Sequence, residues 1–164
     1  GKTLGADIPF FIEEKSFALA KNIGDVITPL PWRIKLWHLI IFFPIKLFSK
    51  DVYEVYSNMY LKDKTERDSK LSVIGKEKIN FTFIKNILKN DLEKSVFSSS
   101  PIVGEIKNAL KDVYEKSFLV SGSGPSVFGL FEDRKEALRA EKLLIKRLPF
   151  LRQKGWRTFV ASTL

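Results

Sequence analysis

The order of the apolar segments is the feature that most limits how this chain can fold. A continuous apolar run at residues 37–43 ends at Pro44, and segments with helical spacing follow it. Two short apolar runs come next, at residues 118–120 and 126–131, and a last helical segment leads to a closing run at residues 156–162. The resulting order is strand, helices, two strands, helix, strand. It predicts an α+β fold with a ferredoxin-like antiparallel sheet and helices on one face.

The run at residues 37–43 is rich in Ile and Phe, which is typical of a strand buried on both faces. It is shorter than the roughly 18 apolar residues that cross a bilayer, so we expect no membrane association. Ser49 is placed to cap the first helix, and Ser100 with Pro101 to begin the third. The positions expected to face inward are Val52, Val55, Tyr56 and Met59; Phe81, Ile84, Leu88, Leu92 and Val96, as one helix; Ile102, Ile106, Ala109, Leu110 and Val113; and Ala137, Ala140, Leu144 and Leu148.

The first 31 residues contain short apolar segments without helices of their own to cover them. The segments at residues 9–12, 17–20 and 26–30 are separated by turn-forming residues, which predicts strands. We therefore expect residues 1–31 to be the remnant of an N-terminal domain with an incomplete sheet, and residues 32–164 to form a C-terminal domain. The sole Met is Met59, so either an initiator Met was removed before Gly1 or the chain is a piece of a longer protein.

The chain is basic, with 28 Lys and Arg against 19 Asp and Glu and a net charge of +9. Nucleic acid is one partner that such a surplus suggests. However, the basic residues near the C-terminus alternate with Glu136 and Glu141, which is typical of the solvated face of an amphipathic helix, and no stretch interleaves them with aromatic residues. We expect no nucleic-acid partner. A phosphorylated small molecule is a second kind of partner that the positive charge could serve. These basic residues are Arg134, Lys135, Arg139, Lys142, Lys146 and Arg147.

The cysteine and histidine content limits metal chemistry. The chain has no Cys, which excludes disulfides and agrees with a cytoplasmic setting. The one histidine, His38, lies in the apolar run, where we interpret it as a core or sheet-edge residue and not as a base. Trp37 and Trp156 are interpreted as packing residues. We therefore expect no metal site formed by His or Cys.

Two stretches are candidates for chemistry. Residues 4–11 read LGADIPFF and place a lone acid, Asp7, directly before an apolar segment, where burial would penalise its charge. Asp7 is either a turn residue that caps backbone N–H groups or an acceptor for a substrate hydroxyl proton. Residues 121–128 read SGSGPSVF. Gly122 and Gly124 allow a ligand to approach the backbone, and the N–H groups of such a turn can bind an anion. A plain hairpin turn accounts for the second pattern about as well.

Taken together, the two stretches resemble the GHMP kinases. The ordered combination is LGADIPF at residues 4–10, NIGD at residues 22–25 before PLP at residues 29–31, and SGSGPSVF at residues 121–128. The resemblance runs from Leu4 to the closing apolar run. It is strongest to the branch that phosphorylates a hydroxyl of a cytidine-diphosphate derivative of methylerythritol in the non-mevalonate isoprenoid pathway. The chain is then expected to be the C-terminal part of an ATP- and Mg²⁺-dependent kinase.

The resemblance implies a role for each matching residue. Asp7 corresponds to the catalytic aspartate, which takes the proton of the substrate hydroxyl during phosphoryl transfer. Gly122, Ser123 and Gly124 correspond to the glycine motif beside the nucleotide. Tyr53 corresponds to the aromatic residue that stacks on the cytosine ring, with Tyr56 or a purely packing role for Tyr53 as the alternatives.

The resemblance also implies what these residues do not contain. The family's ATP-binding loop (Pro-x-x-x-Gly-Leu-Gly-Ser-Ser) and the lysine that partners the aspartate come before the Asp7 motif, and nothing in these 164 residues replaces them. We therefore expect the chain by itself to be inactive. A sibling GHMP kinase such as a homoserine kinase is the alternative. A non-catalytic basic domain of ferredoxin-like type that binds nucleic acid is a more distant one.

Overall fold

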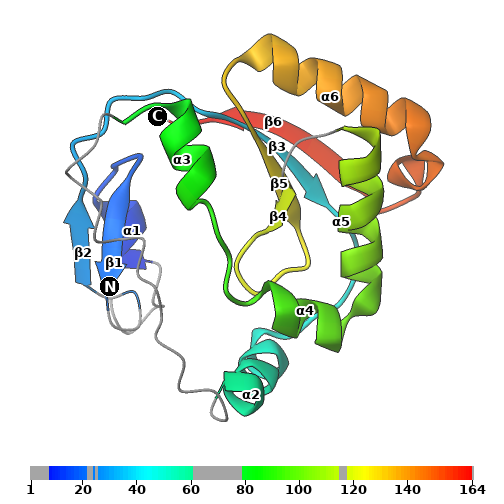
Figure 1. The fold of residues 1–164 in the computed structure, drawn as a ribbon, viewed down its shortest axis with the longest axis horizontal. Helices are drawn as coiled ribbons and strands as arrows, with labels where there is room; N and C mark the ends of the chain where they lie inside the picture. Colours follow the sequence, from blue (N-terminus) through cyan, green and yellow to red (C-terminus); the bar gives the residue numbers. More distant parts are fainter. Residues whose placement is uncertain (1–7, 22–23, 25, 61–78, 115–117, 164) are drawn as a thin grey trace. The chain divides into compact units, whose positions relative to one another are not determined.

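The structure is a computed structural model that divides the chain into two compact units (Figure 1). The first unit comprises residues 1–35 with residues 162–164, and the second comprises residues 36–161. The boundary between residues 35 and 36 lies close to the one expected after residue 31. That the first unit is the remnant of a larger domain stays a prediction. The structure describes residues 8–21, 24, 26–60, 79–114 and 118–163.

The first unit is a short helix followed by a β-hairpin. Helix α1 (Ile8–Ile12) precedes strands β1 (Ala18–Lys21) and β2 (Val26–Pro29), which pair antiparallel. Gly24 adopts a φ of +93° in the connection, where its N–H donates to the carbonyl oxygen of Lys21 at 3.0 Å. None of the described residues of this unit is buried, so these residues form no apolar core of their own.

Helix α1 corrects the expectation of a strand at residues 9–12. Pro9 lies in the first turn of the helix, where its missing N–H removes no intrahelical hydrogen bond. Four consecutive apolar residues carry no periodicity that separates a short helix from a strand. The strands expected at residues 17–20 and 26–30 are confirmed within one residue at each end.

The second unit contains a four-stranded antiparallel sheet. Its strands are β3 (Trp37–Phe42), β4 (Phe118–Val120), β5 (Val127–Phe131) and β6 (Arg157–Ser162), and they lie side by side in the order β4-β5-β3-β6. Strand β5 pairs antiparallel with both β3 and β4. The first strand of the unit thus lies between the third and the last, which is the predicted ferredoxin-like arrangement.

The helices of this unit follow the predicted order along the chain. Helix α6 begins after Asp133, whose carboxylate accepts a hydrogen bond from the backbone N–H of Glu136 at 2.8 Å. Pro101 begins α5 directly after Ser100, as expected, although the Ser100 side chain makes no capping hydrogen bond. The helices are α2 (Ser49–Tyr60), α3 (Phe81–Ile87), α4 (Glu93–Ser99), α5 (Pro101–Val113) and α6 (Arg134–Arg147), with a 3-10 turn η2 (Pro149–Arg152) after α6.

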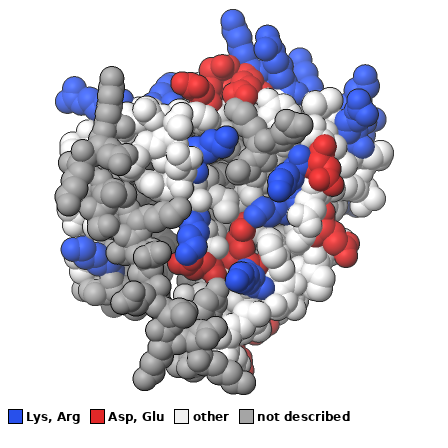
Figure 2. All heavy atoms as spheres, viewed as in Figure 1, with Lys and Arg blue, Asp and Glu red and all other residues white. Residues whose placement is uncertain are grey.

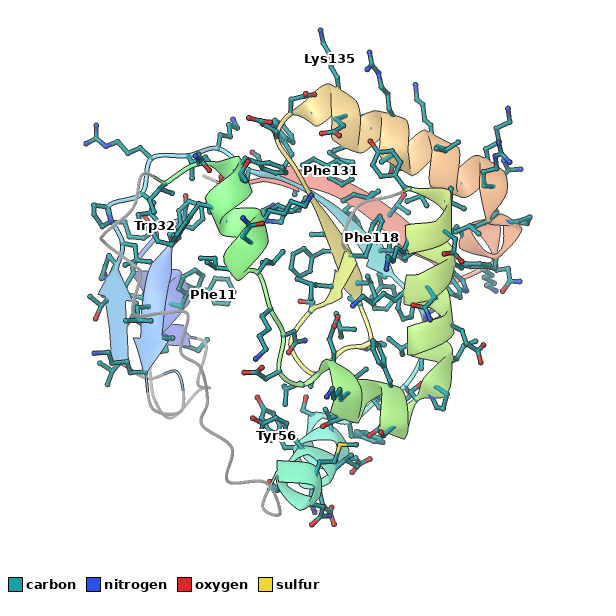
Figure 3. The ribbon with its side chains drawn as sticks, in the orientation of Figure 1. Phe11, Trp32, Tyr56, Phe118, Phe131 and Lys135 are labelled. Atoms are coloured by element: carbon teal, nitrogen blue, oxygen red, sulfur yellow. The ribbon has the colours of Figure 1, made fainter. Side chains whose placement is uncertain are left out.

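The core lies between these helices and one face of the sheet. Gly129 is the central small residue of this face, because it pairs with Leu39 on one side and with Phe118 on the other. Figure 3 shows Phe118 and Phe131 in this layer, and Lys135 of α6 pointing away from it. The core residues are Leu39, Ile41, Phe43, Val52, Val96, Val103, Ile106, Leu110, Phe118, Val120, Val127, Phe131, Ala137, Ala140, Leu144 and Leu151. Trp37 and Trp156 pack against them, which confirms their packing role.

Strand β3 is buried on one face only, which corrects the expectation of burial on both. Leu39 and Ile41 are fully buried under the helices, whereas Phe42 is 41% exposed on the opposite face. His38 lies half-buried on this opposite face, on a strand between two others, and is therefore neither a core nor an edge residue. The asymmetry cannot be read from the sequence of this run, because Ile40 and Phe42 are apolar although Ile40 is only partly buried and Phe42 is exposed.

Three expectations about the helices also need correction. Residues 81–96 form two helices, α3 and α4, because the chain turns at Asn90. Ile102 and Met59, both expected to face inward, are 46% and 43% exposed. In α5 the buried stripe begins one residue later, at Val103, and continues through Ile106 and Leu110.

Candidate functional site

The SGSGPSVF motif forms the turn between β4 and β5, which we call the glycine turn (residues 121–126). The N–H of Ser121 donates to the carbonyl of Ser126 at 2.8 Å, and the N–H of Gly124 donates to the carbonyl of Ser121 at 2.9 Å. Gly122 and Gly124 have φ values of +56° and +78°, a region that favours glycine. The hydrogen bonds close the turn into one defined backbone shape.

The two glycines of the turn serve different purposes. A Cβ on Gly124 would stand 3.3 Å from methyl groups of Val120 and Val96, so this glycine allows the turn to pack on the core. A Cβ on Gly122 would meet nothing within 4 Å. Within the described residues, the N–H groups of Gly122 and Ser123 have no hydrogen-bond acceptor. Open N–H groups beside a left-handed glycine are the elements of an anion-binding nest.

Helix α2 is joined to the glycine turn through its first residue. The hydroxyl of Ser49 lies 2.7 Å from the hydroxyl of Ser123. Ser49 therefore does not act as the expected cap before the helix: it is the first helical residue, and its side chain is used in this contact with the turn. The contact places the N-terminal end of α2 beside the turn.

Tyr53 lies one helical turn beyond Ser49, on the same side of α2, because residues four apart are neighbours on a helix surface. Its side chain is 56% exposed, which leaves the ring available to a ligand. Tyr56 lies one turn farther from Ser49 and is only partly exposed; Figure 3 shows it on α2. Val52, next to Tyr53, is the residue of this segment that enters the core. The exposure and position of Tyr53 agree with the binding role expected for it, which stays a prediction.

Two side chains that the sequence pattern does not predict bind the end of β4 and the start of the glycine turn: Asn90, from the break between α3 and α4, and Glu93, the first residue of α4. The side-chain amide of Asn90 donates to the carbonyl oxygens of Val120 at 2.9 Å and Gly122 at 2.8 Å. Glu93 accepts a hydrogen bond from the backbone N–H of Val120 at 2.8 Å. A signal was present: Asn90 and Asp91 are turn-forming residues inside an otherwise helical pattern.

Glu93 is balanced by a lysine from the next helix. The Lys107 ammonium group lies 2.8 and 2.7 Å from the two carboxylate oxygens of Glu93. The side chains are only 17% and 20% exposed for Glu93 and Lys107. A half-buried carboxylate needs such a partner, because the charge loses much of its hydration. The pair ties α5 to the end of β4.

Two further residues from the sequence analysis are Asp7 and His38. Asp7 lies outside the residues that the structure describes, so its role stays a prediction. Burial lowers the pKa of His38 below its ordinary value, which favours a neutral ring. Its ring lies 6.0 Å from that of Phe128, centre to centre.

The basic residues at the C-terminal end lie on the solvent side of α6, as expected. Figure 2 shows Lys and Arg along this helix. All six are exposed: Arg134, Lys135, Arg139, Lys142, Lys146 and Arg147. Across the part of the chain that the structure describes, no group of three His, Asp or Glu side chains gathers as metal ligands. Among the same residues, no helix combines the length and the apolar character that crossing a membrane requires.

Comparison with known proteins gives relatives over the whole chain. Residues 79–147 match the family described as GHMP kinases C terminal. The 4-diphosphocytidyl-2-C-methyl-D-erythritol kinase of Pelobacter propionicus is 34% identical over 169 residues, which cover 100% of this chain and 54% of that protein. The protein of the same name from Geobacter sulfurreducens is 34% identical over 147 residues, with 90% and 50% covered. The chain thus spans about half the length of the curated relatives it matches.

Solved structures agree with the fold. A crystal structure of a 4-(cytidine 5′-diphospho)-2C-methyl-D-erythritol kinase superposes with a TM-score of 0.67 at 24% identity, over 98% of this chain and 54% of that one. The homoserine kinase from Cytophaga hutchinsonii superposes with a TM-score of 0.59 at 18% identity, over 90% and 47%. At these identities the likeness concerns the fold, which both kinases share with this chain.

Proposed function

We propose that the chain belongs to the GHMP kinases, whose C-terminal family matches residues 79–147, and that it is the C-terminal part of a kinase that phosphorylates a hydroxyl group of 4-diphosphocytidyl-2-C-methyl-D-erythritol. The observation that carries the proposal is the 34% identity to a relative of that name along the entire chain. The exposed tyrosine and the open glycine turn on one side of the second unit support it.

The glycine turn fits a phosphate group. Among the described residues, the N–H groups of Gly122 and Ser123 have no acceptor, and beyond its chain neighbours nothing lies within 4 Å of the position of a Cβ on Gly122, so phosphate oxygens can approach the backbone. Anion binding by successive backbone N–H groups is a common way to hold phosphates. ATP, when bound, supplies the phosphoryl group. The contribution of this chain is to hold and orient phosphate oxygens, because phosphoryl transfer depends on positioning and electrostatic stabilisation.

Asp7 is the proposed catalytic base. A carboxylate can accept the proton of an attacking hydroxyl while it orients that oxygen toward the phosphorus. In the sequence it is the lone acid of the stretch LGADIPFF. Tyr53 is the proposed cytosine contact, since a partly exposed aromatic ring offers a stacking surface to any base.

A resident Mg²⁺ site does not follow from the described residues. Mg²⁺ prefers carboxylate oxygens together with the phosphates of the substrate, and no acidic cluster is present in the described ranges. No step of the mechanism is therefore assigned to the ion. The same proposal includes three further properties. We propose that the protein is cytoplasmic, that it has no nucleic-acid partner, and that these 164 residues are inactive by themselves.

The proposal is tested with the full-length protein that includes the upstream coding sequence. We expect ATP-dependent phosphorylation of the cytidyl-methylerythritol substrate, and a loss of turnover of roughly a hundredfold or more in Asp7→Asn, since general base catalysis contributes about 10²- to 10⁴-fold. Asp51→Asn is the matched control, because Asp51 is an exposed carboxylate in the first turn of α2. Full activity of Asp7→Asn would contradict the role of Asp7. Turnover of homoserine instead of the cytidyl substrate would contradict the substrate assignment.

A further inference from the structure

Strand β4 lies at the edge of the sheet, and side chains occupy the place of a missing neighbour strand. Among the strands of the described residues, the order β4-β5-β3-β6 leaves one side of β4 without a neighbour. In an antiparallel strand the N–H and C=O of one residue point to the same side. Both groups of Val120 are bound by side chains: its N–H donates to Glu93, and its carbonyl accepts from Asn90. We call Asn90 and Glu93 the edge clamp.

Asn90 extends from the strand into the turn. Its amide nitrogen also donates to the carbonyl of Gly122 at 2.8 Å, the first glycine of the turn. Its amide oxygen accepts from the N–H of Leu92 at 3.0 Å, directly before α4. Both ends of the amide are thus engaged, which fixes its orientation. One side chain connects the start of α4, the end of β4 and the glycine turn.

Glu93 gives the clamp its rigidity. Its carboxylate is held between the backbone of Val120 and the ammonium group of Lys107, which binds both oxygens. Charge-assisted hydrogen bonds of this kind are stronger than neutral ones, and the pair is largely shielded from solvent. Because Glu93 begins α4 three residues after Asn90, the ion pair fixes the segment that presents the Asn90 amide.

We propose that Asn90 is a positioning residue for phosphoryl transfer: by holding the carbonyl of Gly122 it sets the direction of the N–H group of Ser123 toward the phosphate. This inference rests on the proposed function. Rotation of the Gly122–Ser123 peptide turns its N–H together with the Gly122 carbonyl, since the peptide unit is planar. A donor at that carbonyl therefore controls where the N–H of Ser123 points.

The alternative role of Asn90 is purely structural, as protection of a free strand edge. The variant Asn90→Asp loses both donors and keeps the acceptor for the N–H of Leu92; a fall in kcat without a matching change in KM then distinguishes positioning from edge protection. Asn80→Asp is the matched control: the Asn80 oxygen accepts from the N–H of Phe83 at 2.8 Å at the start of α3, and Asp keeps this contact. Asn90→Ala removes the donors without adding a negative charge.

The first measurement is amide hydrogen exchange in the full-length protein, which does not depend on any activity. We expect the amides of Ser121 and Gly124, which close the turn, to exchange at least about tenfold faster in both Asn90 variants. Amides of α6 and all amides of Asn80→Asp keep their rates. Unchanged exchange at Ser121 and Gly124 would overturn the claim that Asn90 holds the turn.

The second measurement is the kinetics of the same proteins with ATP and the cytidyl substrate. We expect kcat to fall roughly 10- to 100-fold in both Asn90 variants, the scale expected from a misplaced group, while KM for the cytidyl substrate changes less than about threefold. A fall in Asn90→Asp alone would assign the effect to charge repulsion and overturn the positioning role. An inactive wild-type protein would refute the proposed function, and the exchange rates would still decide whether Asn90 holds the turn.

Discussion

The hydroxyl of Ser49 lies 2.7 Å from the hydroxyl of Ser123, although 74 residues separate them in sequence. The contact joins the first residue of α2 to the middle of the glycine turn. Asn90 binds the carbonyl of Gly122, the residue directly before Ser123. The glycine turn is therefore held by side chains from two distant segments, while the N–H groups of Gly122 and Ser123 have no acceptor among the residues that the structure describes.

The contact between Ser49 and Ser123 predicts a measurable coupling. We expect Ser49→Ala and Ser123→Ala each to lower the free energy of unfolding by about 0.5 to 1.5 kcal/mol, the usual net value of one hydrogen bond. The double variant is expected to lose little more than one single variant, because both remove the same bond. Urea unfolding of the four proteins measures this coupling. Additive losses would show that the two hydroxyls act independently.

Gly129 and Gly104 predict opposite outcomes for the same substitution. In Gly129→Ala the new Cβ would stand 2.7 Å from a ring carbon of Phe118 and 3.1 Å from one of Phe131. Overpacking of this kind costs about 1 to 3 kcal/mol. Gly104 lies inside α5, and a Cβ there would make an ordinary contact of 3.4 Å with Phe97. We expect Gly104→Ala to be neutral or to stabilise by up to about 1 kcal/mol, because Ala favours the helix.

Unfolding free energies of the two glycine variants decide this prediction. Gly122→Ala is a third variant for comparison. Its Cβ would have free space, but the φ of +56° at this residue disfavours a side chain. We expect a cost of about 1 to 2 kcal/mol for the left-handed conformation alone. Equal losses at Gly129 and Gly104 would contradict the close packing around Gly129.

The fold of the second unit follows from the sequence because its segments are long enough to show a period. The alternation of strands and helices, and the buried positions Ala137, Ala140 and Leu144 of α6, were predicted and are confirmed. Strand β3 was predicted as well, but the exposure of Phe42 was not, because this residue is apolar. A hydropathy pattern shows which residues are apolar. Which face of the sheet is buried depends on how the helices pack against it.

The candidate site was predicted only in part, since its contacts join distant segments. The glycine turn was identified from its own residues, whereas its partners Ser49 and Asn90 are 74 and 32 residues from the atoms they bind. The helical spacing of apolar residues predicted one continuous helix across residue 90. The chain turns there instead, because side-chain hydrogen bonds of Asn90 favour a turn. Such contacts depend on how strands and helices pack, so no local pattern reveals them.

His38 predicts a pH dependence of stability. Burial lowers its pKa in the folded protein, so the unfolded chain binds more protons below the ordinary value of about 6.5. Folding stability therefore rises with pH in this window, and we expect it to fall as the pH is lowered below about 6.5. His38 is the one histidine of the sequence, so His38→Phe should remove most of the change between pH 7.5 and 5.5. An identical pH profile for the variant would contradict the prediction.

Tyr53 and Tyr56 predict different consequences for ligand binding and stability. Tyr53 is 56% exposed, so Tyr53→Ala should change the free energy of unfolding by less than about 0.5 kcal/mol. The same variant of the full-length protein should bind cytidine 5′-diphosphate roughly tenfold more weakly, because base stacking on an aromatic ring contributes about 1 to 3 kcal/mol. Tyr53→Phe keeps the ring and should keep the affinity. Tyr56 is more buried, so Tyr56→Ala should lower stability more than affinity. Weaker nucleotide binding in Tyr56→Ala, with normal binding in Tyr53→Ala, would assign the cytosine contact to Tyr56.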